Sequence, residues 1–180
     1  MKRSELSNVL YTLDKQGVYA IARQQLAKYF PTDNPKAFAE GLNRMVREAH
    51  LVRAAKGVFV NPRAHSFDSH AIEHVARCLR PGHYSYVSLE SALSEYGVIS
   101  QIPMDRVTIM TTGRSGVIKT PYGVIEFTHT KQDVGTILDS TVWQEGRPLR
   151  IATKQAAYRD LKHARRNLHL VDTEMLEEAD

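Results

Sequence analysis

The chain has 180 residues, of which 42% are hydrophobic and 24% charged, a composition that excludes a wholly disordered or collagen-like protein. No apolar run approaches the roughly 20 residues that span a bilayer, and polar residues follow the basic pair Lys2-Arg3, so we expect neither a membrane span nor a signal peptide. The single cysteine, Cys78, excludes an internal disulfide and a cysteine-rich zinc site, and we expect a cytoplasmic protein.

The positive charge is concentrated in the first third of the chain. Residues 1–63 hold 11 Lys/Arg and 5 Asp/Glu, a net charge of +6, whereas the whole chain has a net charge of +4. The last nine residues contain five acids. A basic first third predicts contact with a polyanion, although a solvated basic surface would have the same composition.

Three helices are predicted before residue 50. Apolar residues recur at helical spacing over residues 4–16, and a short β-prone segment, residues 18–21, separates this helix from a second one that begins at Ala22. Proline disfavours helix at the residue before it, so Phe30-Pro31-Thr32-Asp33 is expected to be a turn. Asn34-Pro35 then predicts an N-cap followed by proline at the first position of a third helix.

The third helix is predicted to have an apolar face and a polar, mainly cationic face, since successive residues are about 100° apart. The apolar residues that share one face are Phe38, Leu42, Met45, Val46 and Ala49. The polar residues on the opposite face are Lys36, Glu40, Asn43, Arg44 and Arg47. Three cations and an amide on one helix face suit contacts with phosphates and base edges.

A hairpin is predicted after the third helix. Residues 51–54 and 58–60 are β-prone and flank Ala55-Lys56-Gly57, where glycine permits a positive φ, and Asn61-Pro62 closes the unit. The order over residues 1–63 is that of a winged helix-turn-helix, in which the third helix enters a major groove and the hairpin is the wing. Three helices and a hairpin also serve protein contacts alone, so a protein-binding adaptor stays open as an alternative.

The DNA contacts expected from this arrangement come from the third helix, its start, the wing and the N-terminus. They are Lys2, Arg3, Thr32, Asn34, Lys36, Glu40, Asn43, Arg44, Arg47, Arg53 and Lys56. Asn43 and Arg44 are the expected base contacts, because amide and guanidinium groups make paired contacts to adenine and guanine. Thr32 and Asn34 would anchor the helix start to the backbone, and Arg53 and Lys56 would be the wing contacts.

Residues 67–170 are predicted to form a second, mixed domain. Its helices are expected over residues 67–79, residues 89–96 after Ser88 as N-cap, and residues 154–165 after Thr153 as N-cap. The acidic segment 171–180 is expected to be frayed.

The strands of this second domain are expected over residues 107–112, 117–120 and 124–129, where β-prone runs are separated by turns. They predict a small, mainly antiparallel sheet with flanking helices. The fold class is therefore expected to be α+β, with an N-terminal winged helix-turn-helix followed by this mixed domain.

An ordered series of segments resembles one known family. The segments are Tyr86–Ile99 with Gln101-Ile102-Pro103, the strand over 107–112 with its basic turn, Lys119–Gly123 leading into Glu126-Phe127, and Arg150–Ala156. The series is similar to the AbiEi antitoxin family, in which an N-terminal winged helix precedes such a domain. The resemblance spans about residues 5–165.

This resemblance implies a DNA-binding antitoxin and transcriptional autoregulator of a bacterial toxin–antitoxin operon, with a role in phage defence. The implied partners are double-stranded operator DNA and a nucleotidyltransferase-like toxin that the second domain would help to neutralise. The sequence leaves open whether the chain dimerises alone or only on paired half-sites in the DNA. No cofactor, membrane contact or enzymatic activity is expected. A stand-alone winged-helix regulator without a toxin is the alternative.

One motif points to an enzyme instead. His70-Ala71-Ile72-Glu73-His74 matches H-x-x-E-H, in which two histidines one helical turn apart bind zinc and the glutamate is the base, and Glu145 is a conceivable third ligand. Catalytic zinc needs three protein ligands in a formed cleft. We therefore expect no metal, and two half-exposed histidines on a polar helix face.

The remaining candidates have simpler interpretations. Residues 113–120 resemble a phosphate loop only superficially, because Ile118 precedes the lysine and strands follow it. Arg114 and Lys119 are expected to be cations on a hairpin, as auxiliary contacts to nucleic acid or a partner. Cys78 is expected to be a small buried residue, and Trp143 and Tyr158 core or interface aromatics.

Overall fold

The computed structural model describes residues 1–100 and 105–177 and divides into two compact units, Met1–Leu79 and Arg80–Asp180. The mixed α+β class expected from the sequence is confirmed. Helix α4 (Ala71–Leu79) packs against strands of the first unit, whereas the sequence assigned it to the second domain. The segment Gln101-Ile102-Pro103, part of the family resemblance, lies outside the described residues.

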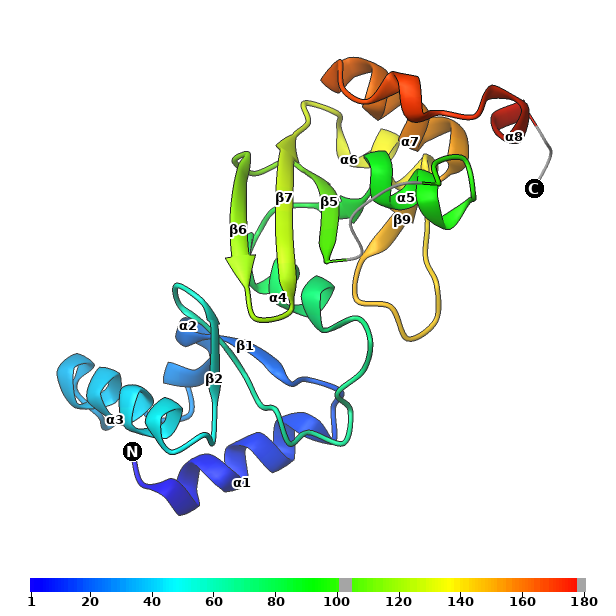
Figure 1. Ribbon diagram of the computed structural model, residues 1–180. Helices are drawn as coiled ribbons and strands as arrows, with labels where there is room; N and C mark the ends of the chain where they lie inside the picture. Colours follow the sequence, from blue (N-terminus) through cyan, green and yellow to red (C-terminus); the bar gives the residue numbers. More distant parts are fainter. Residues whose placement is uncertain (101–104, 178–180) are drawn as a thin grey trace. The chain divides into compact units, whose positions relative to one another are not determined.

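The first unit contains three helices, a three-stranded sheet and then α4 (Figure 1). The elements are α1 (Arg3–Asp14), β1 (Ala20–Ala22), α2 (Arg23–Ala27), α3 (Pro35–Arg47), β2 (Val52–Ala55) and β3 (Val58–Val60). The sheet order is β1-β3-β2 and both pairings are antiparallel. The β-prone segment before α2 therefore pairs with the hairpin, which makes β3 the middle strand.

A shared apolar core explains why these helices pack together. Leu6 and Leu13 of α1 and Leu42 and Met45 of α3 are almost fully buried in one cluster, which also contains Phe59 of β3. The predicted start of α3 is confirmed, since Asn34 Oδ1 accepts a hydrogen bond from the Ala37 backbone N–H at 2.8 Å. Such a cap satisfies one of the backbone donors that a helix start leaves without a partner.

The second unit is a six-stranded sheet with helices. Its strands are β4 (Ser85–Val87), β5 (Arg106–Thr111), β6 (Gly116–Thr120), β7 (Gly123–His129), β8 (Thr141–Val142) and β9 (Arg150–Ala152). Its helices are α5 (Leu89–Glu95), α6 (Val134–Asp139), α7 (Lys154–Ala164), the 3₁₀ turn η1 (Leu168–Leu170) and α8 (Thr173–Glu177).

The sheet is larger and more mixed than the sequence predicted. Its order is β6-β7-β5-β4-β9-β8, and the β5–β7 and β4–β9 pairings are parallel. The short strands β4, β8 and β9 were not expected, because two or three residues are too few to show a strand alternation. Residues 150–152, for which no strand was expected, pair with β4 and β8.

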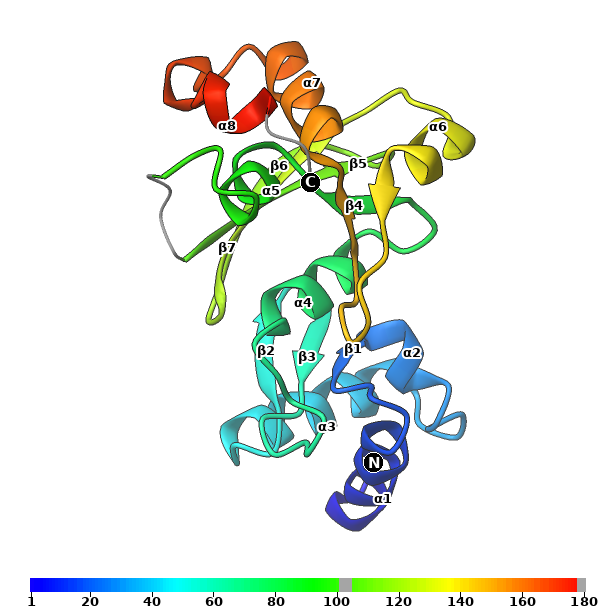
Figure 2. The same cartoon turned by 90° about the vertical axis from the view of Figure 1, so that its right-hand side faces the viewer.

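Helices α5 and α7 pack against each other, and α5 also packs against β5 (Figures 1 and 2). Leu93 of α5 and Leu161 of α7 are fully buried. Thr153 caps α7 as predicted, since its hydroxyl accepts a hydrogen bond from the Ala156 N–H. None of the helices within residues 1–100 and 105–177 is long and apolar enough to cross a membrane.

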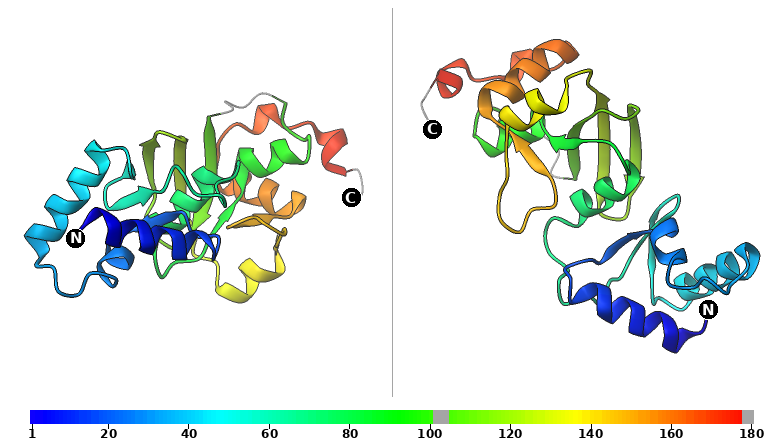
Figure 3. Two further views of the ribbon diagram at one scale, coloured as in Figure 1. Left: turned by 90° about the horizontal axis from the view of Figure 1, so that it is seen from below. Right: turned by 180° about the vertical axis from the view of Figure 1, so that it is seen from behind.

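The acidic end of the chain contains the short helix α8, drawn in red in Figure 3. The Asp172 N–H donates a hydrogen bond to the Val98 carbonyl at 2.9 Å, and the Asp172 carboxylate accepts from the backbone of Glu174 and Met175. These bonds start α8 within the acidic segment, 171–180, that was expected to be frayed. Residues 178–180 lie outside the described part of the chain.

Candidate nucleic-acid interface

The polar face of α3 is exposed as predicted. Its five polar side chains, Lys36, Glu40, Asn43, Arg44 and Arg47, are all exposed. The opposite face is buried at Phe38, Leu42 and Met45, while Val46 is half-buried. Ala49 was expected on the buried face, but α3 ends at Arg47 and Ala49 is exposed with a φ of 54°.

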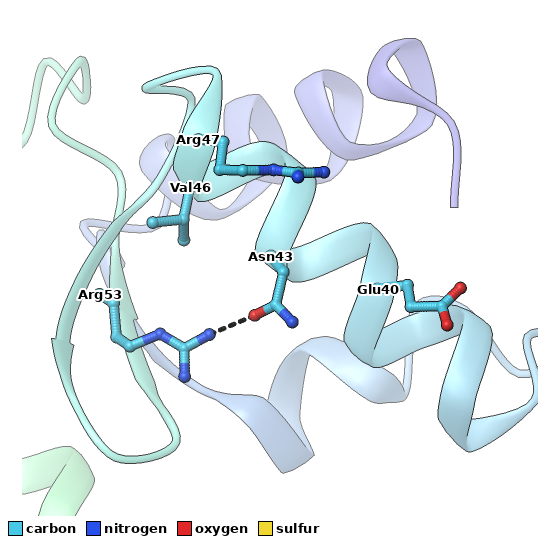
Figure 4. Close-up of a pocket in the computed structure, with 5 residues that line it drawn as sticks. All are labelled: Glu40, Asn43, Val46, Arg47 and Arg53. Carbon is cyan, nitrogen blue, oxygen red and sulfur yellow. Dashed lines mark hydrogen bonds between the residues drawn. The ribbon is translucent and has the colours of Figure 1, made fainter.

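A groove of about 490 Å³ lies beside α3 and is completed by the first strand of the hairpin (Figure 4). It is lined by Glu40, Asn43, Val46 and Arg47 of α3 and by Arg53 of β2. Four of these five residues are polar and only one is acidic. The groove therefore offers mainly hydrogen-bond donors to a ligand.

Arg53 and Asn43 join the hairpin to α3. Arg53 Nη2 donates a hydrogen bond to Asn43 Oδ1 at 2.5 Å, although the two residues belong to different elements. The Arg53 guanidinium also lies over the Phe59 ring, 5.2 Å from its centroid, and Phe59 is 2% exposed. Arg53 pairs with Phe59 across the strands, and a register shift between Arg53 and Ala55 follows directly. A bulge of this kind bends its strand, here directly after Arg53.

Arg44 lies at the flank of the polar face rather than in the groove. Its Nη2 donates a hydrogen bond to the Met1 carbonyl at 2.8 Å. The Met1 ammonium group forms an ion pair with Asp33 at 2.6 Å, which holds the start of the chain against the turn before α3. Arg44 and Asn43 were both expected to be base contacts, but their side chains bond to different neighbours, Met1 and Arg53.

The other predicted DNA contacts do not line the groove. Lys2, Arg3, Thr32 and Asn34 are exposed at the start of α1 and in the turn before α3. Lys56 is exposed at the hairpin tip, next to Gly57 with a φ of 77°, a conformation that glycine adopts without strain.

The two auxiliary cations predicted outside this region belong to the second unit. Arg114 lies in the turn between β5 and β6, and Lys119 lies on β6, both exposed. Arg80 Nε donates to the Arg114 carbonyl at 3.0 Å, and the Arg80 guanidinium lies 4.2 Å from the centroid of the Phe127 ring. Burial, together with the charge of Arg114, lowers the pKa of Arg80.

Two half-exposed histidines were expected in the H-x-x-E-H motif; His70 is half-buried, but His74 is buried. His74 is 9% exposed and its ring lies 4.4 Å from that of Tyr19, while Glu73 is 4% exposed. Asp68 contacts both histidines, at 4.0 Å from His70 Nδ1 and 3.9 Å from His74 Nε2. Burial lowers the pKa of His74, against the opposing charge of Asp68. Within the described ranges, no group of three or more His, Cys, Asp or Glu residues is arranged to hold a metal ion.

Three further single residues were expected to be buried or to lie in the core or an interface. Trp143 is 62% exposed, so of the two expected alternatives, core or interface, only an interface stays open for it. Cys78 is half-buried rather than buried; its thiol donates to the Ala20 carbonyl at 3.3 Å, and burial raises its pKa. Tyr158 is half-buried, with the Lys162 ammonium 4.6 Å from its ring centroid.

A buried polar cluster in the second unit was not predicted. Asp160, 1% exposed, accepts hydrogen bonds from the Tyr86 hydroxyl at 3.0 Å and the Ser88 hydroxyl at 2.8 Å. Ser88 is the N-cap residue of α5 as predicted, but among the described residues its hydroxyl makes no capping bond and donates to Asp160 instead. The one signal in the sequence is that Asp160 falls at helical spacing from the apolar residues Ala156, Ala157 and Leu161, on the buried face of α7.

Comparison with known proteins adds no relative. No family model matches the chain, and no curated protein or solved structure matches it. What the α3 surface binds is therefore inferred from the chemistry of its residues. That chemistry consists of three exposed cations, one amide and one carboxylate on a single helix, with the amide hydrogen-bonded to the hairpin.

Proposed function

We propose that residues 1–63 form a winged helix-turn-helix domain that binds double-stranded DNA, with α3 in the major groove and the β2–β3 hairpin as the wing. The element order α1-β1-α2-α3-β2-β3 and the sheet order β1-β3-β2 support this proposal. The observation that carries it is the exposed donor-rich face of α3, joined to the hairpin through Asn43 and Arg53. Phosphates and base edges of DNA accept hydrogen bonds from such a surface.

The dimensions of α3 are consistent with this role. The helix has 13 residues and is about 20 Å long, and a major groove is wide enough to admit an α-helix. Lys36 and Arg47 lie about three turns apart on its exposed face and would meet phosphates on either side of the contacted bases. Lys56 at the hairpin tip would contact the adjacent backbone.

The proposed cellular role is that of an antitoxin that represses its own operon. The resemblance to the AbiEi family supports this role, with the second unit acting in neutralisation of a nucleotidyltransferase-like toxin. A stand-alone regulator would share the DNA-binding surface and lack the toxin partner.

DNA binding is tested with the full chain and a labelled duplex of the region upstream of its gene. We expect retardation of that duplex, with an affinity that falls steeply as salt rises, because cations that neutralise phosphates release counterions. Lys36→Gln and Arg47→Gln are each expected to reduce the slope of log K against log salt by about one. The matched control is Lys131→Gln in the second unit. Absence of retardation at low salt would refute the proposal.

The antitoxin role is tested separately by co-expression. If a nucleotidyltransferase-like reading frame adjoins this gene, its expression alone is expected to stop growth, and co-expression of the full chain to restore it. DNA binding without rescue would leave the stand-alone regulator as the function.

A further inference from the structure

We infer that the α3 surface selects guanine in the major groove, through a donor-only edge formed by Asn43 and Arg53. This inference rests on the proposed DNA binding and adds which base the surface recognises. It replaces the paired contact of Asn43 with adenine that the sequence predicted.

The Arg53 side chain is held in place by two contacts. Its guanidinium donates to Asn43 Oδ1 at 2.5 Å and lies over the buried ring of Phe59, whose centroid is 5.2 Å away. Both Arg53 and Asn43 are exposed and line the groove beside α3, so the pair faces a ligand there. Arg53 is therefore a positioning residue for Asn43 as well as a contact of its own.

The hydrogen bond fixes which end of the Asn43 amide is presented. Figure 4 shows Oδ1 turned toward Arg53 and the amide nitrogen turned away from it. A paired contact with adenine needs both ends of the amide on one base edge, the nitrogen donating to N7 and the oxygen accepting from N6. The Arg53 guanidinium occupies the oxygen side, so a base would meet the amide nitrogen and the Nε and Nη1 donors of Arg53.

A donor-only edge selects one base. Guanine presents two neighbouring acceptors in the major groove, O6 and N7, whereas adenine pairs an acceptor with a donor and cytosine presents a donor. Asn43 and Arg53 together supply donors for both guanine acceptors. Glu40, three residues before Asn43 and also on the groove, supplies an acceptor suited to the N4 amino group of a cytosine.

The test begins with selection of duplexes from a random-sequence pool by the full chain, followed by base-analogue substitution in the recovered site. We expect at least one position of the selected duplexes to require guanine. Replacement of its G·C pair by A·T should weaken Kd about 5- to 150-fold. 7-Deazaguanine, which lacks the N7 acceptor, should also weaken binding, whereas inosine, which keeps O6 and N7 and lacks only the minor-groove amino group, should bind like guanine.

A variant then assigns the preference to the Asn43–Arg53 pair. Arg53→Met keeps an apolar stem over Phe59 and releases Asn43 Oδ1, so we expect the guanine requirement at that position to be lost and adenine to be accepted. Lys56→Met in the same hairpin is the matched control, which should weaken binding to all duplexes and keep the guanine preference. Unchanged urea unfolding of both variants would show that the fold is intact.

The outcomes separate this inference from the function on which it rests. Selected duplexes without a guanine requirement, or a guanine preference that survives Arg53→Met, would overturn the inference while DNA binding stands. Failure of the wild-type chain to enrich any duplex would overturn the proposed function and the inference together.

Discussion

Tyr86 donates a hydrogen bond from its hydroxyl to Asp160, 3.0 Å away, in the interior of the second unit. The same carboxylate accepts from Ser88 at 2.8 Å and from the Gln132 side chain at 3.2 Å. Burial and the neighbouring Asp160 charge raise the pKa of Tyr86, so its hydroxyl stays a donor. One aspartate of α7 thus connects β4, the start of α5 and the segment before α6.

Removal of this carboxylate should destabilise the second unit. Asp160→Ala leaves the buried hydroxyls of Tyr86 and Ser88 without their acceptor, and we expect the free energy of unfolding to fall by about 3 kcal/mol. Urea unfolding followed by the fluorescence of Trp143, which lies in this unit, measures the change. Asp139→Ala at an exposed position is the control, with an expected change within about 0.5 kcal/mol. Equal effects of the two variants would contradict a structural role for the cluster.

Asp14 should make the stability of the first unit depend on pH in the acid range. The Ser66 hydroxyl, at 2.6 Å, and the backbone N–H groups of Ser66 and His65 lower the pKa of Asp14 below its ordinary value of 3.8. A carboxylate with a lowered folded pKa contributes stability above its ordinary pKa, and that stability is lost as pH falls through the folded value.

Substitution of Asp14 tests this dependence. We expect Asp14→Asn to be less stable than wild type at pH 7, and the difference to shrink as pH falls below 3.8. Urea unfolding followed by circular dichroism, at pH 7 and at a pH below 3.8, gives the free energies of unfolding to compare. A difference that stays constant across this range would show that the hydrogen bonds to Asp14 do not favour its charged form.

His74 should also make the stability of the first unit fall as pH falls, but in a higher pH range than Asp14. Burial lowers its folded pKa below the ordinary value of 6.5, so the unfolded chain binds the proton more readily, and stability is lost as pH falls below 6.5. His74→Phe keeps an aromatic ring beside Tyr19 and cannot titrate. We therefore expect its stability to change less than that of wild type between pH 7.5 and 5.5, measured by urea unfolding. His169→Phe, at an exposed position, should retain the wild-type dependence.

Arg44 should contribute to affinity without contributing to sequence preference. Its guanidinium lies against the Met1 carbonyl at the flank of α3, a position suited to a phosphate. Arg44→Gln is expected to weaken binding to the selected duplex and to random duplexes by the same factor, with a salt slope lower by about one. Lys15→Gln, at the other end of α1, is the control. Loss restricted to the selected duplex would return Arg44 to the base-contact role predicted from the sequence.

The local pattern of the first unit was sufficient to predict most of its elements. The Asn34-Pro35 start, the buried and exposed faces of α3 and the hairpin around Gly57 all depend on neighbours within a few residues. The pairing of β1 with β3 was not predictable in this way, because its partners are about 40 residues apart. The Asn43–Arg53 hydrogen bond was not predictable either, because it joins a helix to a strand and depends on the direction of both side chains.

The second unit was less predictable for two physical reasons. Its strands β4, β8 and β9 are stabilised by sheet neighbours rather than by their own pattern, so residues 150–152 resembled the approach to a helix. Its buried polar groups, such as Asp160 and Ser88, are stabilised by partners more than 70 residues apart. A hydrophobic pattern cannot distinguish such a buried acid from an exposed one.

The central position of β3 has a consequence for how the length of the β2–β3 hairpin could change. Hydrogen bonds on both sides hold β3 in the sheet, and its register with β1 fixes where the hairpin leaves the domain. Only Lys56 and Gly57 lie between β2 and β3, and no heavy atom approaches within 4 Å of a Cβ built at Gly57. Residues inserted there would lengthen the reach of the hairpin and leave the sheet and α3 as they are. A longer tip would thus extend the surface beside α3 from an unchanged domain.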